Sequence, residues 1–168
     1  LGMDEIHVTM IYGNNEGDEV TKVAQAVKEQ VEGALPGLTI DLQAMTKAER
    51  LEKMQNDDYC VALTRWGPDY ADPLTYFDLW SDGYTHNYGE WHSDAYMELL
   101  DNIKKGELAV DVEARWAAFQ DLEQMIADEA VILPVYQACT ANLVKANVKG
   151  IHFHSVGLNR IYREVTIG

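Results

Sequence analysis

The sequence has little positive charge, few cysteines and no long hydrophobic run. Only 13 Lys and Arg stand against 28 Asp and Glu in 168 residues, for a formal net charge of −15 at pH 7. Nucleic acids and anionic membranes bind through clustered cations, so this composition argues against a nucleic-acid partner. An acidic surface suits cationic or amine-bearing ligands, or serves only solvation. No apolar stretch approaches the roughly 20 residues of a membrane span.

The two cysteines, Cys60 and Cys139, lie in separate apolar runs and match no metal-binding or redox spacing. We expect buried thiols, with one disulfide as the alternative, and we expect no cofactor. The sequence opens with "LGMDEIHV", which runs straight into strand-like sequence without a signal-peptide pattern. We therefore expect the chain to be a piece of a longer protein.

Hydrophobic periodicity predicts an α/β fold. Runs of β-branched and apolar residues predict strands over 6–12, 38–44 and 59–65. Helical spacing of apolar residues predicts helices over 18–33 and 47–55, between those strands. This β-α-β-α-β order implies right-handed crossovers and a parallel arrangement.

The second half of the chain is predicted to add two helices and another strand. The helices are expected over 93–105, with Ser93 as N-cap and Gly106 at the end, and over 111–128. A strand is expected over 131–137, which would make the sheet mixed. Because we find no repeat, low-complexity tract or clear linker, we expect one α/β lobe, a mixed sheet flanked by helices.

The segment 67–92 is too long for an ordinary loop and too aromatic for disorder. Such aromatic density at loop positions is typical of a binding surface, because Trp and Tyr give large contact area with few rotatable bonds. Phe77 and Trp80 are instead expected to attach the loop to the core. The aromatic residues in and beside this segment are Trp66, Tyr70, Tyr76, Phe77, Trp80, Tyr84, Tyr88, Trp91 and Tyr96.

One functional hypothesis for this loop is an acidic hydrolase or a metal-dependent domain. His86, Glu90 and His92 fall within seven residues, and His and carboxylates are zinc ligands. Paired carboxylates also perform acid–base hydrolysis, and four aspartates are available here, Asp69, Asp72, Asp78 and Asp82. However, no HExxH, CxxC or GxSxG pattern occurs. Asp72, before Pro73, is also typical of a turn, so its replacement by Asn is expected to change ligand affinity little.

The other hypothesis comes from a resemblance carried by three stretches in order. The first, "DYCVALTRWGPDYADPLTYF", resembles a motif of the extracytoplasmic solute-binding proteins of peptide ABC importers, roughly "G-W-x-A-D-Y-x-D-P-x-x-F" after a strand. Downstream, "NYGEWHSDAYMELLDNIKKG" is similar to that family's "N-x-x-x-W-x-S-P-x-Y-D-x-L-I". The stretch from "EARWAAFQDLEQ" to "PVYQACTANLVKANVKG" is similar to the family's ending. The resemblance covers essentially the whole chain.

The resemblance implies a fold, a site and partners. Residues 1–168 would form a periplasmic-binding-protein-like α/β lobe, the C-terminal lobe of a two-lobe receptor. The receptor, not an enzyme, would bind dipeptides or oligopeptides between its lobes and deliver them to an ABC permease in the membrane. The parent would be extracytoplasmic, in the periplasm or as a cell-surface lipoprotein, and this chain's partners would be the peptide, the N-terminal lobe and the permease.

The implied ligand-binding residues all lie in "RWGPDY". In the resembling family the motif aspartate pairs with the α-amino group of the bound peptide, which places that role on Asp69, with Trp66 as the neighbouring cleft wall. Gly67 and Pro68 would turn the backbone sharply, beside Tyr70. Arg65 replaces the family's usual Gly and either reaches a ligand carboxylate or points to solvent.

Overall fold

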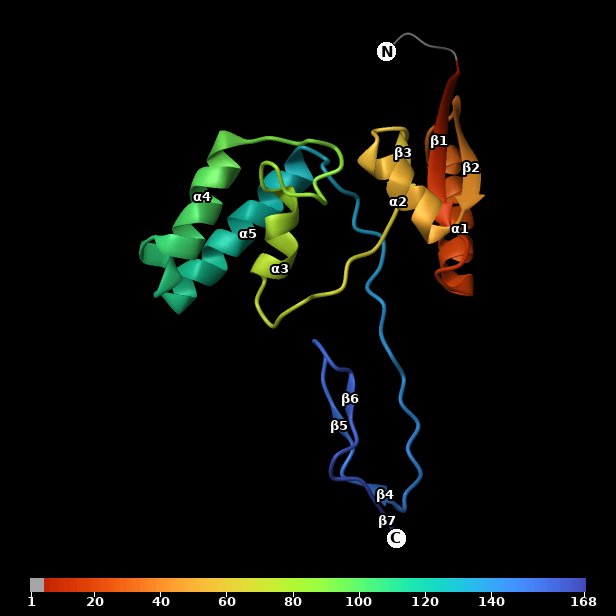
Figure 1. Ribbon diagram of the computed structural model, residues 1–168. Coiled ribbons are helices and arrows are strands. Elements are labelled where there is room, and N and C mark those ends of the chain that lie inside the picture. Colours follow the sequence, from red (N-terminus) through yellow and green to blue (C-terminus); the bar gives the residue numbers. More distant parts are fainter. Residues whose placement is uncertain (1–4) are drawn as a thin grey trace. The chain divides into compact units, whose positions relative to one another are not determined.

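The computed structural model describes residues 5–168; the first four residues of the predicted lobe lie outside this range. The described chain divides into two compact units (Figure 1). We call the part up to Trp66 the sheet unit and the part from Gly67 to Gly168 the helical unit. The expectation that both belong to a single lobe stays a prediction.

The sheet unit contains the predicted β-α-β-α-β order. Its strands are β1 (Ile6–Gly13), β2 (Leu38–Met45) and the short β3 (Val61–Leu63), and its helices are α1 (Asp18–Ala34) and α2 (Lys47–Gln55). The strand order is β2-β1-β3, and β1 pairs in parallel with both neighbours. The predicted α/β class is confirmed, although β3 is shorter than the sequence predicted.

The middle strand β1 holds the core of the sheet unit. Alternate side chains of a strand point to opposite faces, and Met10 and Tyr12 share a buried cluster with Val20 and Ala24 of α1. Ile11, which points the other way, is also buried, with 1% of its surface exposed. Burial on both faces is what a parallel strand between helices requires.

Local capping fixes where the helices of the sheet unit begin. Gly17 adopts φ 125°, a region that favours glycine, and α1 starts at the next residue. Before α2, the Thr46 hydroxyl accepts a hydrogen bond from the Glu49 N–H at 3.3 Å, and the Glu49 carboxylate accepts one from the Thr46 N–H at 2.8 Å. This capping box satisfies donors that the helix leaves unpaired.

The helical unit contains both helices that the sequence predicted in the second half. The helices are α3 (Leu74–Phe77), η1 (Asp78–Trp80), α4 (Asp94–Lys105), η2 (Glu107–Ala109) and α5 (Val112–Asp128). Ser93 caps α4, because its hydroxyl accepts a hydrogen bond from the Tyr96 N–H, and Gly106 ends that helix, both as predicted. Asp111 caps α5 in the same way.

The loop before α4 is attached to the core of the helical unit through aromatic side chains. The Phe77 ring stacks on Phe119 with centroids 5.1 Å apart, and Trp80 packs on the same cluster, which confirms both predicted attachments. The Tyr96 hydroxyl donates a hydrogen bond to the Phe77 carbonyl at 2.7 Å. Burial, together with the charge of nearby Asp78, raises the pKa of Tyr96 far above its ordinary value of 10.0, so Tyr96 stays a neutral donor.

The strand predicted over 131–137 is wrong. Residues 132–145 are extended without strand pairing to any described residue (Figure 1). Several of their apolar side chains are exposed, including Leu133 and Leu143. Two short antiparallel ribbons follow, β4 (Val148–Lys149) with β7 (Thr166–Ile167) and β5 (His152–Phe153) with β6 (Arg160–Ile161). A strand needs a partner as well as propensity, because its backbone groups must be paired.

The expectation of buried thiols is also wrong. Cys60 and Cys139 are exposed and free. Cys60 precedes the short β3, and Cys139 lies in the extended stretch 132–145. Both positions lie outside a paired strand, so the apolar runs around them do not place the thiols in a core.

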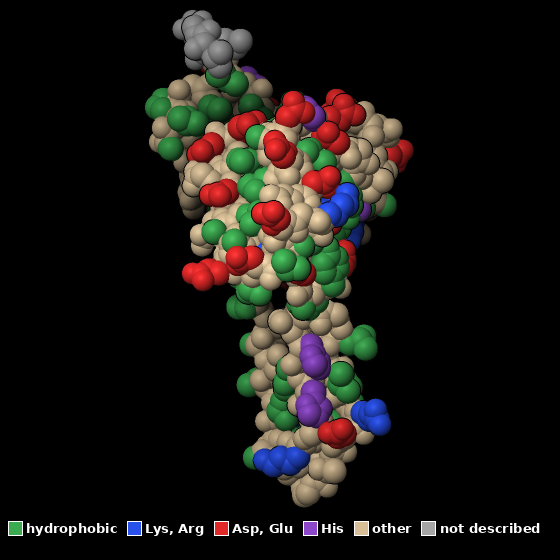
Figure 2. Space-filling view, turned by 90° about the vertical axis from the view of Figure 1, so that its left-hand side faces the viewer, with side chains coloured by type: hydrophobic (Ala, Val, Ile, Leu, Met, Phe, Trp, Pro, Cys, Tyr) green, Lys and Arg blue, Asp and Glu red, His purple; other side chains and the backbone are tan. Residues whose placement is uncertain are grey.

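The surface of the described residues reflects the acidic composition. Figure 2 shows many Asp and Glu side chains spread over one face, with few Lys and Arg among them. Within residues 5–168, no helix is both long and apolar enough to cross a lipid bilayer.

Candidate functional site

The predicted ligand-binding residues lie where the two units meet in the sequence. Arg65 and Trp66 are the last residues of the sheet unit, just after β3. Gly67, Pro68, Asp69 and Tyr70 are the first residues of the helical unit.

Arg65 is bound to the loop between β1 and α1. Its guanidinium donates a hydrogen bond to the main-chain carbonyl of Glu16 at 2.8 Å and lies 3.4 Å from the Glu19 carboxylate. The side chain of Glu16 in turn pairs with Arg50 at 3.0 Å, and both of these groups are buried. These contacts hold the end of β3 to a neighbouring loop, while the Arg65 side chain stays 50% exposed. Its two predicted roles, reaching a ligand carboxylate or pointing to solvent, stay predictions. Trp66, next to it, is half-buried.

Asp69 is exposed, and its backbone is nevertheless held in place. The Asp69 N–H donates a hydrogen bond to the Thr75 hydroxyl at 2.9 Å, and Thr75 in α3 is buried. Within residues 5–168, no hydrogen bond or ion pair engages the Asp69 carboxylate. The backbone of Asp69 is therefore fixed, while its carboxylate has no partner in the described chain and is available to a ligand.

The other aspartates of the loop all have internal partners. Asp72 is paired with Arg115, whose two terminal nitrogens lie 2.8 and 3.0 Å from its oxygens. Lys104 Nζ lies 2.5 Å from Asp78, and His92 Nδ1 lies 2.9 Å from Asp82. The three pairs are Asp72–Arg115, Asp78–Lys104 and Asp82–His92. Among the four loop aspartates, Asp69 alone has no such partner in the described chain.

Asp72 combines the predicted turn role with a charge pair. Its carboxylate accepts a hydrogen bond from the Leu74 N–H at 3.0 Å, as expected of a turn residue. Partial burial disfavours ionisation, but the hydrogen bonds from Arg115 and Leu74 outweigh it and hold the pKa of Asp72 below its ordinary 3.8. Sequence reasoning missed Arg115, because 43 residues separate it from Asp72.

Exposed tyrosines lie on the same loop. Tyr70, Tyr76 and Tyr84 each expose between 39% and 45% of their surface. The Tyr70 hydroxyl donates a hydrogen bond to Asp78 at 3.4 Å. Partial burial and the negative charge of Asp78 raise the pKa of Tyr70 above its ordinary 10.0, so the hydroxyl remains protonated. The loop thus presents aromatic contact area beside Asp69, as the sequence predicted.

The histidines of the loop do not converge on a metal site. Among residues 5–168, no group of three or more His, Cys, Asp or Glu is arranged to hold a metal ion. His86 packs against the rings of Tyr84 and Tyr88. His92 lies between two carboxylates, with Nδ1 toward Asp82 and Nε2 toward Asp94 at 3.2 Å.

These two carboxylates predict a measurable pH dependence. The hydrogen bond to Asp82, with its charge and that of Asp94, raises the pKa of His92 above its ordinary 6.5. A raised folded-state pKa means that the stabilisation is fully present below pH 6.5 and is lost as the pH rises through the folded value. NMR titration of His92 should show this raised pKa. Asp82→Asn should return it toward 6.5, and an unchanged value in that variant would contradict the assignment.

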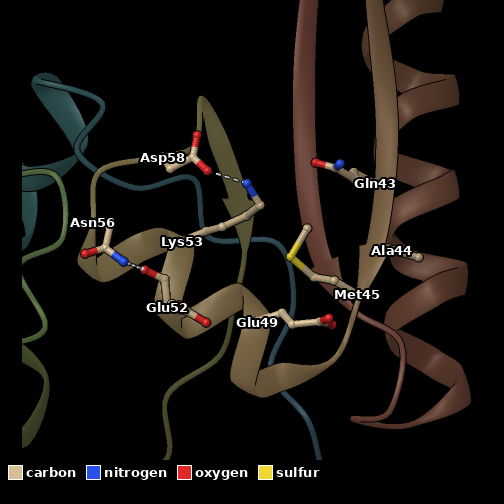
Figure 3. Close-up of a pocket in the computed structure, with 8 residues that line it drawn as sticks. All are labelled: Gln43, Ala44, Met45, Glu49, Glu52, Lys53, Asn56 and Asp58. Atoms are coloured by element: carbon tan, nitrogen blue, oxygen red, sulfur yellow. Dashed lines mark hydrogen bonds and ion pairs between the residues drawn. The ribbon is translucent and has the colours of Figure 1, made fainter.

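A separate hollow of about 460 Å³ lies in the sheet unit (Figure 3). Lys53 in it pairs with Asp58, and Asn56 donates a hydrogen bond to the Glu52 carbonyl at 2.9 Å. None of the six predicted ligand-binding residues lines this hollow, so the candidate site is the motif and not this hollow. The lining residues are Gln43, Ala44, Met45, Glu49, Glu52, Lys53, Asn56 and Asp58.

Comparison with known proteins relates this chain to one family. Residues 2–88 match the family model described as bacterial extracellular solute-binding proteins, family 5, middle. The dipeptide-binding protein DppE of Bacillus subtilis is 28% identical over 150 residues, which are 89% of this chain and 26% of the relative. The chain therefore spans about a quarter of the length of such curated relatives.

Solved structures agree as well. The substrate-binding domain of an oligopeptide ABC transporter from Bacillus anthracis superposes with a TM-score of 0.81 at 27% identity, over 99% of this chain and 32% of that one. Listeria monocytogenes OppA bound to peptide superposes with a TM-score of 0.77 at 28% identity, over 99% of this chain and 30% of that one. The rival hypothesis of an acidic hydrolase or metal-dependent domain has no support in these comparisons. The chain belongs to family 5 of the bacterial extracellular solute-binding proteins.

Proposed function

We propose that this chain is the ligand-contacting C-terminal lobe of a receptor for an ABC importer. The full-length parent would bind dipeptides or oligopeptides in a cleft between two lobes and deliver them to a membrane permease. Its partners are then the peptide, the N-terminal lobe of the same parent and the permease. As a binding protein the chain carries no catalytic role, and its place is outside the cytoplasm, in the periplasm or on the cell surface as a lipoprotein.

The observation that carries this proposal is the uncommitted carboxylate of Asp69. A peptide's α-ammonium enclosed in a cleft loses its water and needs a carboxylate partner. The other three aspartates of the loop are already paired with Arg115, Lys104 and His92. Asp69 is therefore the loop aspartate whose carboxylate is available to pair with the ammonium of a ligand.

The neighbours of Asp69 suit the same role. Trp66 follows the end of β3, and ligands of open α/β sheets bind at the carboxyl ends of the strands. Gly67 is exposed, and Pro68 limits the backbone conformations of the turn. Tyr70 adds exposed aromatic surface next to the carboxylate. Arg65, whose side chain is 50% exposed just after β3, is the candidate to reach a ligand carboxylate.

The test compares two peptides on the unmodified full-length parent. Trialanine with a free amino group should bind at least about 30-fold more tightly than N-acetyl-trialanine in titration calorimetry. Trialanine amide, which keeps the ammonium and loses the carboxylate, is the matched control for a general charge effect. Equal affinity for the free and acetylated peptides would remove Asp69 as an amine site, and no binding of any short peptide would refute the function.

A further inference from the structure

The Asp72 carboxylate is held on both of its oxygens. Arg115 Nη1 donates to Oδ2 at 2.8 Å, and Nη2 donates to Oδ1 at 3.0 Å. Oδ1 also accepts the Leu74 N–H. The side chains of Arg115 and Asp72 expose only 23% and 30% of their surface. A bidentate guanidinium–carboxylate pair fixes orientation as well as distance, which a single contact does not.

Arg115 itself is held by the core of the helical unit. Its guanidinium lies 4.9 Å from the centroid of the Phe119 ring, and Phe119 is 3% exposed and stacks on Phe77. Arg115 lies only four residues after the N-cap of α5. A cation near a helix N-terminus is unfavourable to the helix dipole, so helix stability does not account for this residue.

A short hydrogen-bonded path leads from Asp72 to Asp69. The Thr75 N–H donates to the Asp72 carbonyl at 3.2 Å, and the Thr75 hydroxyl accepts the Asp69 N–H at 2.9 Å. The Asp72 N–H donates to the Tyr70 carbonyl at 2.9 Å, which closes the turn. Fixing Asp72 to α5 therefore fixes the backbone from which the Asp69 carboxylate projects.

We propose that Arg115 and Asp72 are positioning residues for the Asp69 carboxylate, and that they set selectivity for a free peptide amino terminus without contacting the ligand. This inference rests on the proposed function. It also revises the expectation from sequence that Asp72→Asn leaves ligand affinity nearly unchanged. That expectation treated Asp72 as a turn residue alone, without the pair to Arg115.

The experiment measures selectivity, which a purely structural role would not move. Trialanine and N-acetyl-trialanine are titrated into the full-length parent and into its Arg115→Lys and Asp72→Asn variants. Each variant should bind trialanine about tenfold more weakly, because a carboxylate that is no longer held in position must be ordered when the ligand binds. Affinity for N-acetyl-trialanine should stay unchanged. Arg115→Lys keeps the positive charge and removes the bidentate geometry. A loss in this variant would therefore come from the position of Asp72 and not from the charge at residue 115.

Lys28→Gln is the matched control, because its pair with Glu32 has similar exposure and lies in the sheet unit. This variant should bind both peptides as the unmodified parent does. Equal losses for the two peptides, or no loss for either, in Arg115→Lys and Asp72→Asn would overturn the inference. If the unmodified parent binds both peptides equally, Asp69 is not the amine site and this inference fails while the proposed function stands. If the parent binds no short peptide, the proposed function itself fails.

Discussion

Replacing Asp69 by Asn in the full-length parent should weaken the binding of a short free peptide by about 2–5 kcal/mol. The substitution keeps the size of the side chain and leaves the peptide's ammonium enclosed without a carboxylate. Within the described chain, the Asp69 carboxylate has no other partner whose loss would complicate the result. Its backbone hydrogen bond to Thr75 is unaffected by the change. Titration calorimetry of trialanine measures the loss.

The same interaction can be removed from the ligand side. N-acetylation of the peptide and Asp69→Asn should cost similar amounts, and the two together should cost clearly less than their sum. Asp101→Asn is a suitable control, because Asp101 is an exposed aspartate of the same unit whose pair with Lys105 lies on the surface of α4. Full additivity of the two changes would show that Asp69 and the amino group do not meet.

The second large effect is expected from the buried pair of Glu16 and Arg50. Their side chains expose only 8% and 1% of their surface, and Arg50 Nε has no hydrogen-bond partner in the described chain. Glu16→Ala leaves the Arg50 charge buried and uncompensated, which typically costs about 3–5 kcal/mol. Hydrogen exchange of the β1 amides should report this loss as faster exchange, because their protection reflects the local free energy of opening.

Two variants separate this effect from the loss of contacts alone. Glu19→Ala removes the exposed pair with Arg65 and should cost about 0–1 kcal/mol. Adding Arg50→Met to Glu16→Ala removes the stranded charge and should restore much of the protection. Equal protection in Glu16→Ala and Glu19→Ala would show that the burial of Arg50 carries no such penalty.

Much of the fold could be predicted because its signals are local. Ser93 and Gly106 mark the two ends of α4, since a hydroxyl N-cap and a terminal glycine act on the nearest backbone groups. The parallel strands β1 and β2 follow from two apolar runs separated by one helix. The place of Asp69 in the loop after β3 could be read from the residues around it, because the motif is contiguous, while its role toward a ligand stays a prediction.

What could not be predicted depends on partners distant in the sequence. The stretch 132–145 has strand-like composition, and no described strand edge pairs with it. Arg115 pairs with Asp72 although 43 residues separate them, and neither local sequence indicates this contact. Arg65 contacts Glu16 and Glu19, which lie 46 to 49 residues earlier in the chain, and nothing next to the motif indicates this contact.

The two exposed thiols make the arrangement of the units measurable. The sequence has only two cysteines, and Cys60 lies in the sheet unit while Cys139 lies in the helical unit. A donor and an acceptor dye on these thiols would report the separation of the units by resonance energy transfer, with no added attachment points. Because Cys139 lies in an extended segment, a change in transfer on adding peptide would report either unit motion or ordering of that segment. A second variant, with Cys139 replaced and a cysteine introduced on α5, would distinguish the two.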